Sequence, residues 1–291
     1  FDCAVTSLGM LGIVTKVTLQ LTDTYNVRQR VYGGWPPQAH EAIPSGSLSR
    51  LLASLPEAMA STTSFSAFVD WSVDDPGMLI LRDAIPKGSS PPPPPLPEWA
   101  GVPLRTDPVI GFLEGFGDLD ATSEGPWCDK MHIWMKDGKP FGPQGAPELQ
   151  LEHFVPLRYA GDALEIMQAV GAQWGSSLLY AEVRAVRGGG QLLSPYTCDE
   201  EDGFDTLAIT NGLSGGLGER RVLQAAAVLE AALAPFKARP HWGKLTAMRP
   251  GDIERVYGER LFRFRAVCAA ADPTGKFRNA WLNRMVMGLG G

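Results

Sequence analysis

The chain has 291 residues, of which 44% are hydrophobic and 20% are charged, and its net charge is −6. This length and hydrophobic content allow one large core or two unequal cores. An acidic chain lacks the basic surface typical of nucleic-acid-binding proteins, so a nucleic-acid partner is not expected. The four scattered cysteines form no C-x-x-C pair, which argues against a zinc ribbon and favours a reducing, cytoplasmic location. No apolar run approaches the roughly 20 residues of a membrane helix, and no signal peptide is recognisable.

The N-terminal region predicts a strand over residues 13–21 (IVTKVTLQL), where apolar and polar residues alternate. Just before it, Gly9 and Gly12 stand three residues apart in SLGMLG. Glycines in such a setting indicate a tight turn or the close approach of another segment or a ligand. The chain opens on Phe1 inside this apolar region, so we expect a fragment, a processed product or one half of a split protein.

Residues 47–61 predict a short helix with Ser47 or Ser49 as its N-cap, and SFSAFVDW then has strand character. Residues 84–148 differ in composition from the rest of the chain, with five consecutive prolines (Pro91–Pro95) among glycine- and proline-rich loops. The proline run predicts a stiff, exposed polyproline II segment. A rigid surface spacer is the preferred interpretation, and a ligand for an SH3-type groove is the alternative.

Regular order resumes in the second half of the chain. Residues 149–157, 176–186 and 204–212 predict strands, and residues 159–174 predict an amphipathic helix. A helix is expected over 218–236, followed by two more around 251–258 and 258–270. Amphipathic strands separated by helices predict an α+β fold, in which an antiparallel sheet is covered by helices.

One predicted strand carries a row of functional side chains. In LLYAEVRAV, Tyr180, Glu182 and Arg184 share one face because strand side chains alternate. The plain interpretation is a solvated face with a surface ion pair. The functional interpretation is a sheet floor that recognises a polyhydroxylated ligand, with arginine donors and glutamate acceptors.

Two other strands repeat this pattern. Gln150, Glu152 and Phe154 share a face of one, and Thr206 and Thr210 share a face of the other together with Ala208. If these strands are neighbours, their polar faces form one continuous surface. The candidate substrate-binding residues are Glu152, Tyr180, Thr210 and Asn211.

The stretch RPHWGKL, residues 239–245, gathers three potential cations and a tryptophan around Gly243. A lysine such as Lys244 beside an electron-accepting ring can stabilise negative charge that develops there, as an oxyanion hole does. A structural role, capping a carbonyl, is equally open for His241. The chain has only four histidines (His40, His132, His153 and His241), which limits the candidates for a general base.

Five stretches in order along the chain resemble FAD-linked oxidoreductases of the vanillyl-alcohol oxidase superfamily. They are AVTSLGMLGIVTKVTLQL, GPWCDKMHIW with ELQLEHFVPL, AEVRAV with LLSPY, RPHWGK, and DPTGKFRNAWL. The nearest branch is that of alditol oxidases and aldonolactone oxidases. The resemblance implies flavin-dependent oxidation of a C–OH group of a polyol, sugar or sugar-like substrate. It assigns the catalytic roles to Lys244, Glu182 and Arg184.

The resemblance also implies FAD as the cofactor, bound beside Ser7, Gly9, Gly12, Ile13, His241 and Lys244. It divides the chain into residues 1–22 as the end of an FAD-binding domain, 23–258 as a substrate-binding cap domain with a Pro-rich insertion around 84–148, and 259–291 as a C-terminal segment that packs back toward the FAD domain. No pyrophosphate loop is present, so the expected partner is an N-terminal FAD-binding half, supplied as a separate or cleaved chain.

One departure concerns the proton acceptor. Alditol oxidases carry a histidine on the strand after SPY, whereas this chain reads LAITNGL, with Thr210 or Asn211 near that place. Neither side chain is a base at neutral pH. Two alternatives therefore remain beside polyol oxidation: a tailoring enzyme acting on a larger glycosylated natural product, and a non-catalytic binding fragment.

Overall fold

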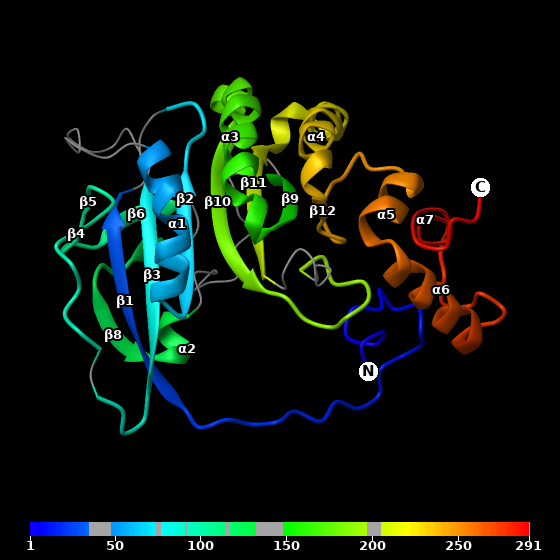
Figure 1. Cartoon of the computed structure of the whole chain (residues 1–291), viewed down its shortest axis with the longest axis horizontal. Coiled ribbons are helices and arrows are strands. Elements are labelled where there is room, and N and C mark those ends of the chain that lie inside the picture. The colour runs from blue at the N-terminus through cyan, green and yellow to red at the C-terminus, as the bar shows by residue number, and fades with distance from the viewer. Residues whose placement is uncertain are drawn as a thin grey trace.

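The computed structural model describes residues 1–34, 48–73, 77–90, 92–113, 117–131, 148–196 and 205–290. Within these residues eight strands form one sheet in the order β12-β9-β11-β10-β2-β3-β1-β8, with every neighbouring pair antiparallel (Figure 1). Two small two-stranded sheets pair β4 with β5 and β6 with β7. The predicted α+β class, an antiparallel sheet with helices, is confirmed.

The strands are β1 (Tyr25–Gly33), β2 (Ser64–Val69), β3 (Met78–Pro86), β4 (Glu98–Trp99), β5 (Val102–Pro103), β6 (Val109–Leu113), β7 (Gly117–Leu119), β8 (Ser123–Pro126), β9 (Glu148–Pro156), β10 (Leu178–Arg187), β11 (Asp205–Ser214) and β12 (Arg239–Pro240). The helices are α1 (Leu48–Ser61), α2 (Trp127–Lys130), α3 (Ala160–Gly171), α4 (Glu219–Leu233), α5 (Pro250–Tyr257), α6 (Glu259–Ala271) and α7 (Ala280–Met285).

One face of the sheet carries the main hydrophobic core. Helices α1, α3 and α4 lie over this face, where Leu55, Leu164 and Leu229 pack against strand residues such as Val183 and Ile209 (Figure 1). The predicted helices over 47–61, 159–174 and 218–236 are confirmed as α1, α3 and α4. Because apolar side chains alternate along β10 and β11, the opposite face of these strands is left with the polar set.

A second core lies beyond the edge strand β12. Helices α5, α6 and α7 pack there around Leu261 and Phe264, together with Leu193 and with Met10 of the N-terminal turn (Figure 1). This core already includes Ile253 of α5. The C-terminal packing unit therefore begins before residue 259, the boundary expected from the sequence.

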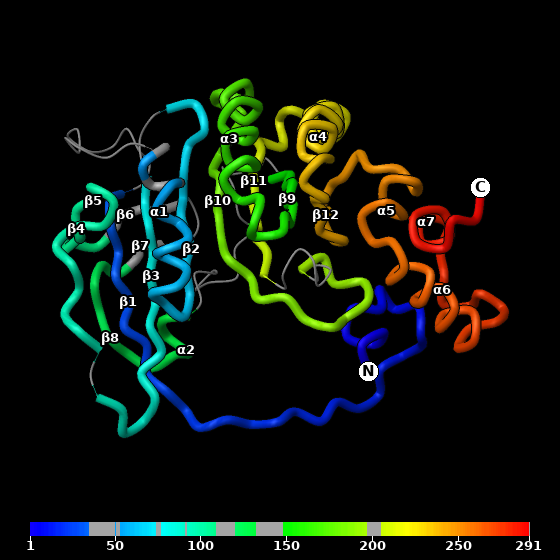
Figure 2. Tube along the Cα trace, viewed as in Figure 1, coloured from blue at the N-terminus to red at the C-terminus, as the bar shows by residue number. Residues whose placement is uncertain are grey.

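The strand predicted over residues 13–21 does not form. Residues 12–24 pair with no strand in the described part of the chain, and they run as an extended segment from the N-terminal turn to β1 (Figure 2). Five of their apolar side chains are strongly exposed: Ile13 81%, Val14 75%, Val17 66%, Leu19 75% and Leu21 81%. A strand needs a neighbour to satisfy its backbone hydrogen bonds, and among the described residues this segment has none.

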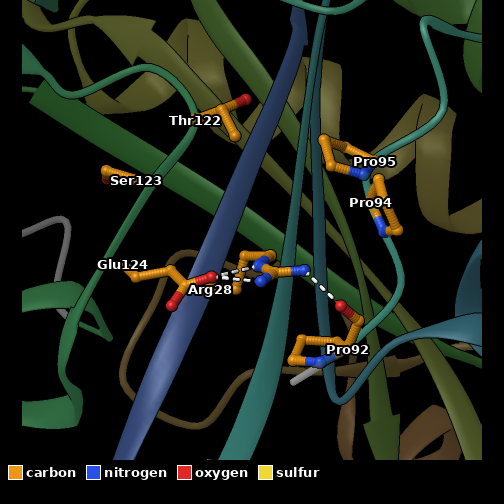
Figure 3. Close-up of a pocket in the computed structure, with 7 residues that line it drawn as sticks. All are labelled: Arg28, Pro92, Pro94, Pro95, Thr122, Ser123 and Glu124. Carbon is orange, nitrogen blue, oxygen red and sulfur yellow. Dashed lines mark hydrogen bonds and ion pairs between the residues drawn. The ribbon is translucent and has the colours of Figure 1, made fainter.

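The region 84–148 is not wholly an insertion. Strand β3 extends to Pro86, and β8 pairs with β1 as the last strand of the main sheet. The described part of the proline run is fastened to the same edge, because Arg28 Nη1 donates to the carbonyls of Pro92 and Pro93 at 2.7 and 2.9 Å. Arg28 also pairs with Glu124, and these residues line a pocket of about 430 Å³ (Figure 3). Carbonyls held in this way favour the rigid spacer over an SH3-type ligand.

No helix among the described residues is long and apolar enough to cross a membrane.

Candidate active site

The three strands with polar faces are neighbours in the sheet, an arrangement that the sequence had left open. Strand β11 lies between β9 and β10, and the register places Thr210 opposite both Glu182 and Glu152. Residues directly opposite each other in an antiparallel pair share a face of the sheet. Tyr180, Glu182 and Arg184 therefore form one floor with the polar residues of β9 and β11.

Glu152 is the centre of this floor. Its carboxylate is 4% exposed and accepts a hydrogen bond from Arg184 Nη2 at 2.8 Å on one oxygen, while Lys244 Nζ pairs with the other. Burial by itself would raise the pKa of Glu152, but the charges of Arg184 and Lys244 hold that pKa below its ordinary value. The floor thus holds a permanent carboxylate between two cations at neutral pH.

Glu182 continues the network toward the middle of the sheet. Its Oε1 accepts a hydrogen bond from Ser66 Oγ of β2 at 2.8 Å, and its Oε2 lies 3.5 Å from Arg184 Nε. Arg184 Nη2 also donates to Thr210 Oγ1 at 3.3 Å. A third cation, Arg82, lies 3% exposed on the same face of β3; burial lowers its pKa to about 10, and the Glu182 carboxylate opposes that shift.

Lys244 reaches the floor from a bulge at the sheet edge. Beyond β12, the amide of His241 donates to the carbonyl of Glu152 at 3.0 Å, and the amide of Leu245 donates to that of Gln150 at 3.2 Å. A regular antiparallel ladder would advance both strands equally. Here the edge segment advances by two additional residues, so Trp242–Lys244 protrude, closed by a bond from the Lys244 amide to the His241 carbonyl at 3.1 Å. Bulges of this kind re-aim side chains next to active sites.

His241 lies over the same floor in its neutral form. Its ring stacks on Phe154 with 6.1 Å between centroids, and burial is the main cause that lowers its pKa. The backbone N–H of Gly243 donates to His241 Nδ1 at 3.0 Å, so the proton of the neutral ring belongs on Nε2. His241 is thus arranged to donate a hydrogen bond, and a Cβ at position 243 would lie only 3.3 Å from its ring.

The other polar residues of RPHWGKL are anchors to the second core. Trp242 Nε1 donates to the carbonyl of Leu193 at 2.7 Å, and its ring stacks on Tyr257. Arg239 is 4% exposed, and its Nε donates to the carbonyl of Val256 at 2.8 Å. Of the three potential cations in this stretch, only Lys244 contacts the floor as an ion pair.

Tyr180 closes one end of the floor. Its hydroxyl donates to Glu148 at 2.7 Å and accepts from Gln150 at 2.8 Å. Burial and the Glu148 carboxylate raise its pKa, so the phenol stays protonated. Gly212 makes room for this arrangement, because a Cβ there would lie 2.3 Å from the tyrosine ring.

The assignment of Asn211 to substrate binding is wrong. Asn211 stands on the helix-covered face of β11, fully buried, and its Oδ1 accepts a hydrogen bond from Trp71 Nε1 at 2.8 Å. The one-residue offset from Thr210 places it on the opposite face of the strand. His153 is likewise on the core face, paired with Glu230, so it does not meet the floor. His40 and His132 lie outside the described residues.

Tyr196 belongs to the site but was not named among the candidates. Its ring meets Phe154 edge-on at 4.8 Å, and its pKa is raised by burial and then by the Glu152 carboxylate, while Arg184 opposes the shift. The phenol is therefore close to the central charges of the floor. The sequence feature that could have identified Tyr196 is its position in LLSPY, one of the stretches that carry the family resemblance.

The N-terminal turn is separate from the floor but joined to its surroundings. The Met10 amide donates to the Ser7 carbonyl at 2.9 Å, and Met10 enters the second core against which Trp242 packs. Gly9 and Gly12 have φ of 75° and 133°, and no atom lies within 4 Å of where a Cβ would stand. The backbone at these two glycines is therefore open to the close approach of another group.

Comparisons with known proteins agree with this picture. Residues 150–285 match the family described as D-arabinono-1,4-lactone oxidase (ALO). An alditol oxidase from Streptomyces sp. (strain IKD472 / FERM P-14339) is 30% identical over 289 residues, covering 99% of this chain and 63% of that protein. A long-chain alcohol oxidase from an uncultured marine euryarchaeote is 39% identical over 51 residues, covering 18% of this chain and 10% of that protein. The chain thus spans less than two thirds of the length of these relatives.

Solved structures share the fold. The VAO-type flavoprotein MtVAO615 from Myceliophthora thermophila C1 superposes with a TM-score of 0.57 at 11% identity, over 92% of this chain and 49% of that chain. CrmK, a flavoenzyme involved in caerulomycin biosynthesis, gives 0.54 at 13% identity, over 90% and 56%. The fold is that of VAO-type flavoproteins. The sequence is similar to the D-arabinono-1,4-lactone oxidase family model and to the alditol oxidase, and the fold is similar to VAO-type flavoproteins, which confirms the resemblance drawn from the five stretches.

Proposed function

We propose that this chain forms the substrate-binding part of an FAD-dependent oxidoreductase that oxidises a CH–OH carbon of a polyol, sugar or sugar-like substrate. The observation that carries the proposal is the floor itself, where Glu152 joins Arg184 to Lys244 and Glu182 lies beside them. Such alternating donors and acceptors match the hydroxyls of a polyol. The name of the alditol oxidase relative supports the same class of substrate.

Each floor residue has a defined task in this proposal. Arg184, whose side chain is 32% exposed, donates to substrate hydroxyls with the N–H groups that Glu152, Thr210 and Glu182 do not use, and the Glu182 carboxylate accepts from the substrate hydroxyls. Lys244 keeps two of its three N–H donors beyond the bond to Glu152, and its charge stabilises negative charge that develops near the reacting oxygen. The Nε2–H of His241 adds a neutral donor.

FAD is the cofactor that the proposal requires. When bound, it supplies the chemistry of accepting the hydride from the substrate carbon. The residues that would hold it are Ser7, Gly9, Gly12 and Ile13 of the N-terminal turn, with His241 and Lys244 at the floor. The open backbone at both glycines is what supports this assignment.

The partner that we propose is an FAD-binding portion packed against residues 1–22. The support is the stripe of exposed apolar side chains from Ile13 to Leu21, which water would otherwise cover at a cost of about 25 cal/mol per Å². An alternating apolar segment with unpaired backbone is suited to join a sheet as an added strand. In this proposal the oxidation requires both portions together.

A flavin absorbance spectrum and denaturing mass spectrometry of the protein from its native source test this function. We expect a yellow sample that bleaches anaerobically when a suitable member of a panel of alditols, aldoses and glycosylated compounds is added. The compound that bleaches it distinguishes a small polyol from a larger natural product. A colourless sample would overturn the catalytic proposal and favour a binding fragment.

A further inference from the structure

The segment that follows Lys244 is held by a buried carboxylate on helix α4. Glu230 is 6% exposed, and its Oε1 accepts a hydrogen bond from Thr246 Oγ1 at 2.7 Å. The amide of Ala247 donates to the same carboxylate, at 3.1 Å to Oε2. Thr246 Oγ1 in turn accepts from the amide of Met248 at 3.1 Å. The chain is therefore fastened two and three residues after the lysine.

The same carboxylate also holds the strand that carries Glu152. His153 Nε2 lies 3.1 Å from Glu230 Oε1, with both side chains almost fully buried. His153 follows Glu152 directly on β9 and points to the opposite face. One carboxylate thus ties together the two segments whose side chains, Lys244 and Glu152, meet on the floor.

The position of Glu230 is not explained by the packing of its helix. The buried face of α4 is otherwise apolar, formed by Val222, Ala226, Leu229 and Leu233. A carboxylate in such a face costs free energy unless hydrogen bonds compensate it, and a leucine or alanine would pack there without that cost. The polar contacts that compensate Glu230 all come from β9 and from the segment after Lys244.

We propose that Glu230 is a positioning residue that fixes the Lys244 bulge relative to β9, acting from the face of the sheet opposite to the floor. This inference rests on the proposed function of Lys244. Misplacement of a catalytic group by about 1 Å costs about 10²-fold in rate. A rigid support for the segment that carries Lys244 therefore affects the rate of the reaction even though Glu230 does not touch the floor. Within the described residues, Thr246, Ala247 and His153 hold the Glu230 carboxylate, whereas His153 Nδ1 has no hydrogen-bond partner. Buried hydrogen bonds to one carboxylate restrict the movement of the segments that they join.

Hydrogen exchange of the purified full protein, measured by mass spectrometry, tests without any substrate whether Glu230 holds the Lys244 bulge. In Glu230→Gln, the side-chain amide has one acceptor oxygen in place of the two of the carboxylate. It therefore cannot accept from Thr246, Ala247 and His153 as Glu230 does, while the side-chain volume is kept. We expect roughly tenfold faster exchange in residues 241–248 and no change in β10. Glu219→Gln, on the exposed first turn of the same helix, is the matched control.

A second variant and a kinetic measurement keep the inference falsifiable. Thr246→Val removes one hydroxyl contact and leaves the buried charge, so it serves if Glu230→Gln fails to fold. Turnover by the complete enzyme should fall about tenfold in either variant, with KM changed much less, because geometry and not substrate binding is lost. Unchanged exchange over 241–248 in the folded variants, or an increase spread evenly over the sheet, would overturn the inference. If wild-type protein oxidises no alcohol, the proposed function fails, whereas the exchange result still decides whether Glu230 holds the bulge.

Discussion

Lys244 donates to the carboxylate of Glu152 from outside the regular sheet, although the two residues lie far apart in sequence. The contact exists because the edge segment carries two additional residues between its bonds to β9, which push the lysine over the floor. A charge pair built in this way is sensitive to both partners.

Replacing Lys244 with alanine should reduce turnover by about 10²–10³-fold while the protein stays folded. The charge beside the reacting oxygen is lost, but Arg184 still compensates the Glu152 carboxylate. Anaerobic flavin bleaching and thermal unfolding measure the two effects. Lys87→Ala, at an exposed lysine after β3, is the control. Undiminished turnover in the Lys244 variant would remove this residue from the mechanism.

Arg184→Lys should raise KM by about 10–100-fold, although the charge is kept. A guanidinium contacts Glu152 and Thr210 through Nη2 and still has donors on two other nitrogens, whereas an ammonium has all three of its donors on one nitrogen and a shorter reach. Steady-state kinetics will show the change. The same replacement at the exposed Arg187, at the end of β10, should have no effect. An equal rise in both variants would point to a loss of strand stability and not of substrate contacts.

Asn211 and Thr210 are neighbours in sequence whose replacements should give opposite results. Asn211→Ala leaves Trp71 Nε1 without its acceptor in the core, so unfolding free energy should fall by about 1–3 kcal/mol with KM unchanged. Thr210→Val removes a hydroxyl from the floor, so KM should rise with little loss of stability. Urea unfolding and kinetics of both variants decide the matter. A change in KM for Asn211→Ala without destabilisation would return this residue to the site.

Stability should fall on acidification through two groups of the floor. The folded pKa of His241 lies below its ordinary value of 6.5, so the unfolded chain binds a proton first as the pH drops below that value. The folded pKa of Glu152 lies below its ordinary value of 4.5, so its contribution is present above 4.5 and is lost as the pH falls through the folded pKa. Both shifts make the unfolding free energy decrease toward acid.

Urea unfolding at a series of pH values between about 7 and about 2.5 measures this dependence. His241→Gln should flatten the part of the curve just below the ordinary histidine pKa, and leave the more acidic part that belongs to the carboxylate. Stability that rises in acid would contradict both assignments.

The sequence alone determined which residues could share a face. Alternation along β10 placed Tyr180, Glu182 and Arg184 together, and the apolar periodicity located α1, α3 and α4, because both patterns are local and repeat every few residues. The short helix α7 and the site residue Tyr196 were missed, since neither stands in a periodic stretch. Asn211 became a candidate because it stands near the place of the family histidine, and the alternation of the strand puts it on the face opposite to Thr210.

Tertiary structure decided everything that depends on which segments are neighbours. The strand order β9-β11-β10 turned three polar faces into one floor, and residues 12–24, which pair with no strand in the described part of the chain, are extended and exposed. Only the edge bulge brought Lys244 to Glu152, and only the packing of α4 against β9 brought Glu230 to His153. Local sequence specifies the direction of a side chain through backbone geometry, whereas its partner depends on the arrangement that buries the apolar faces of the whole chain.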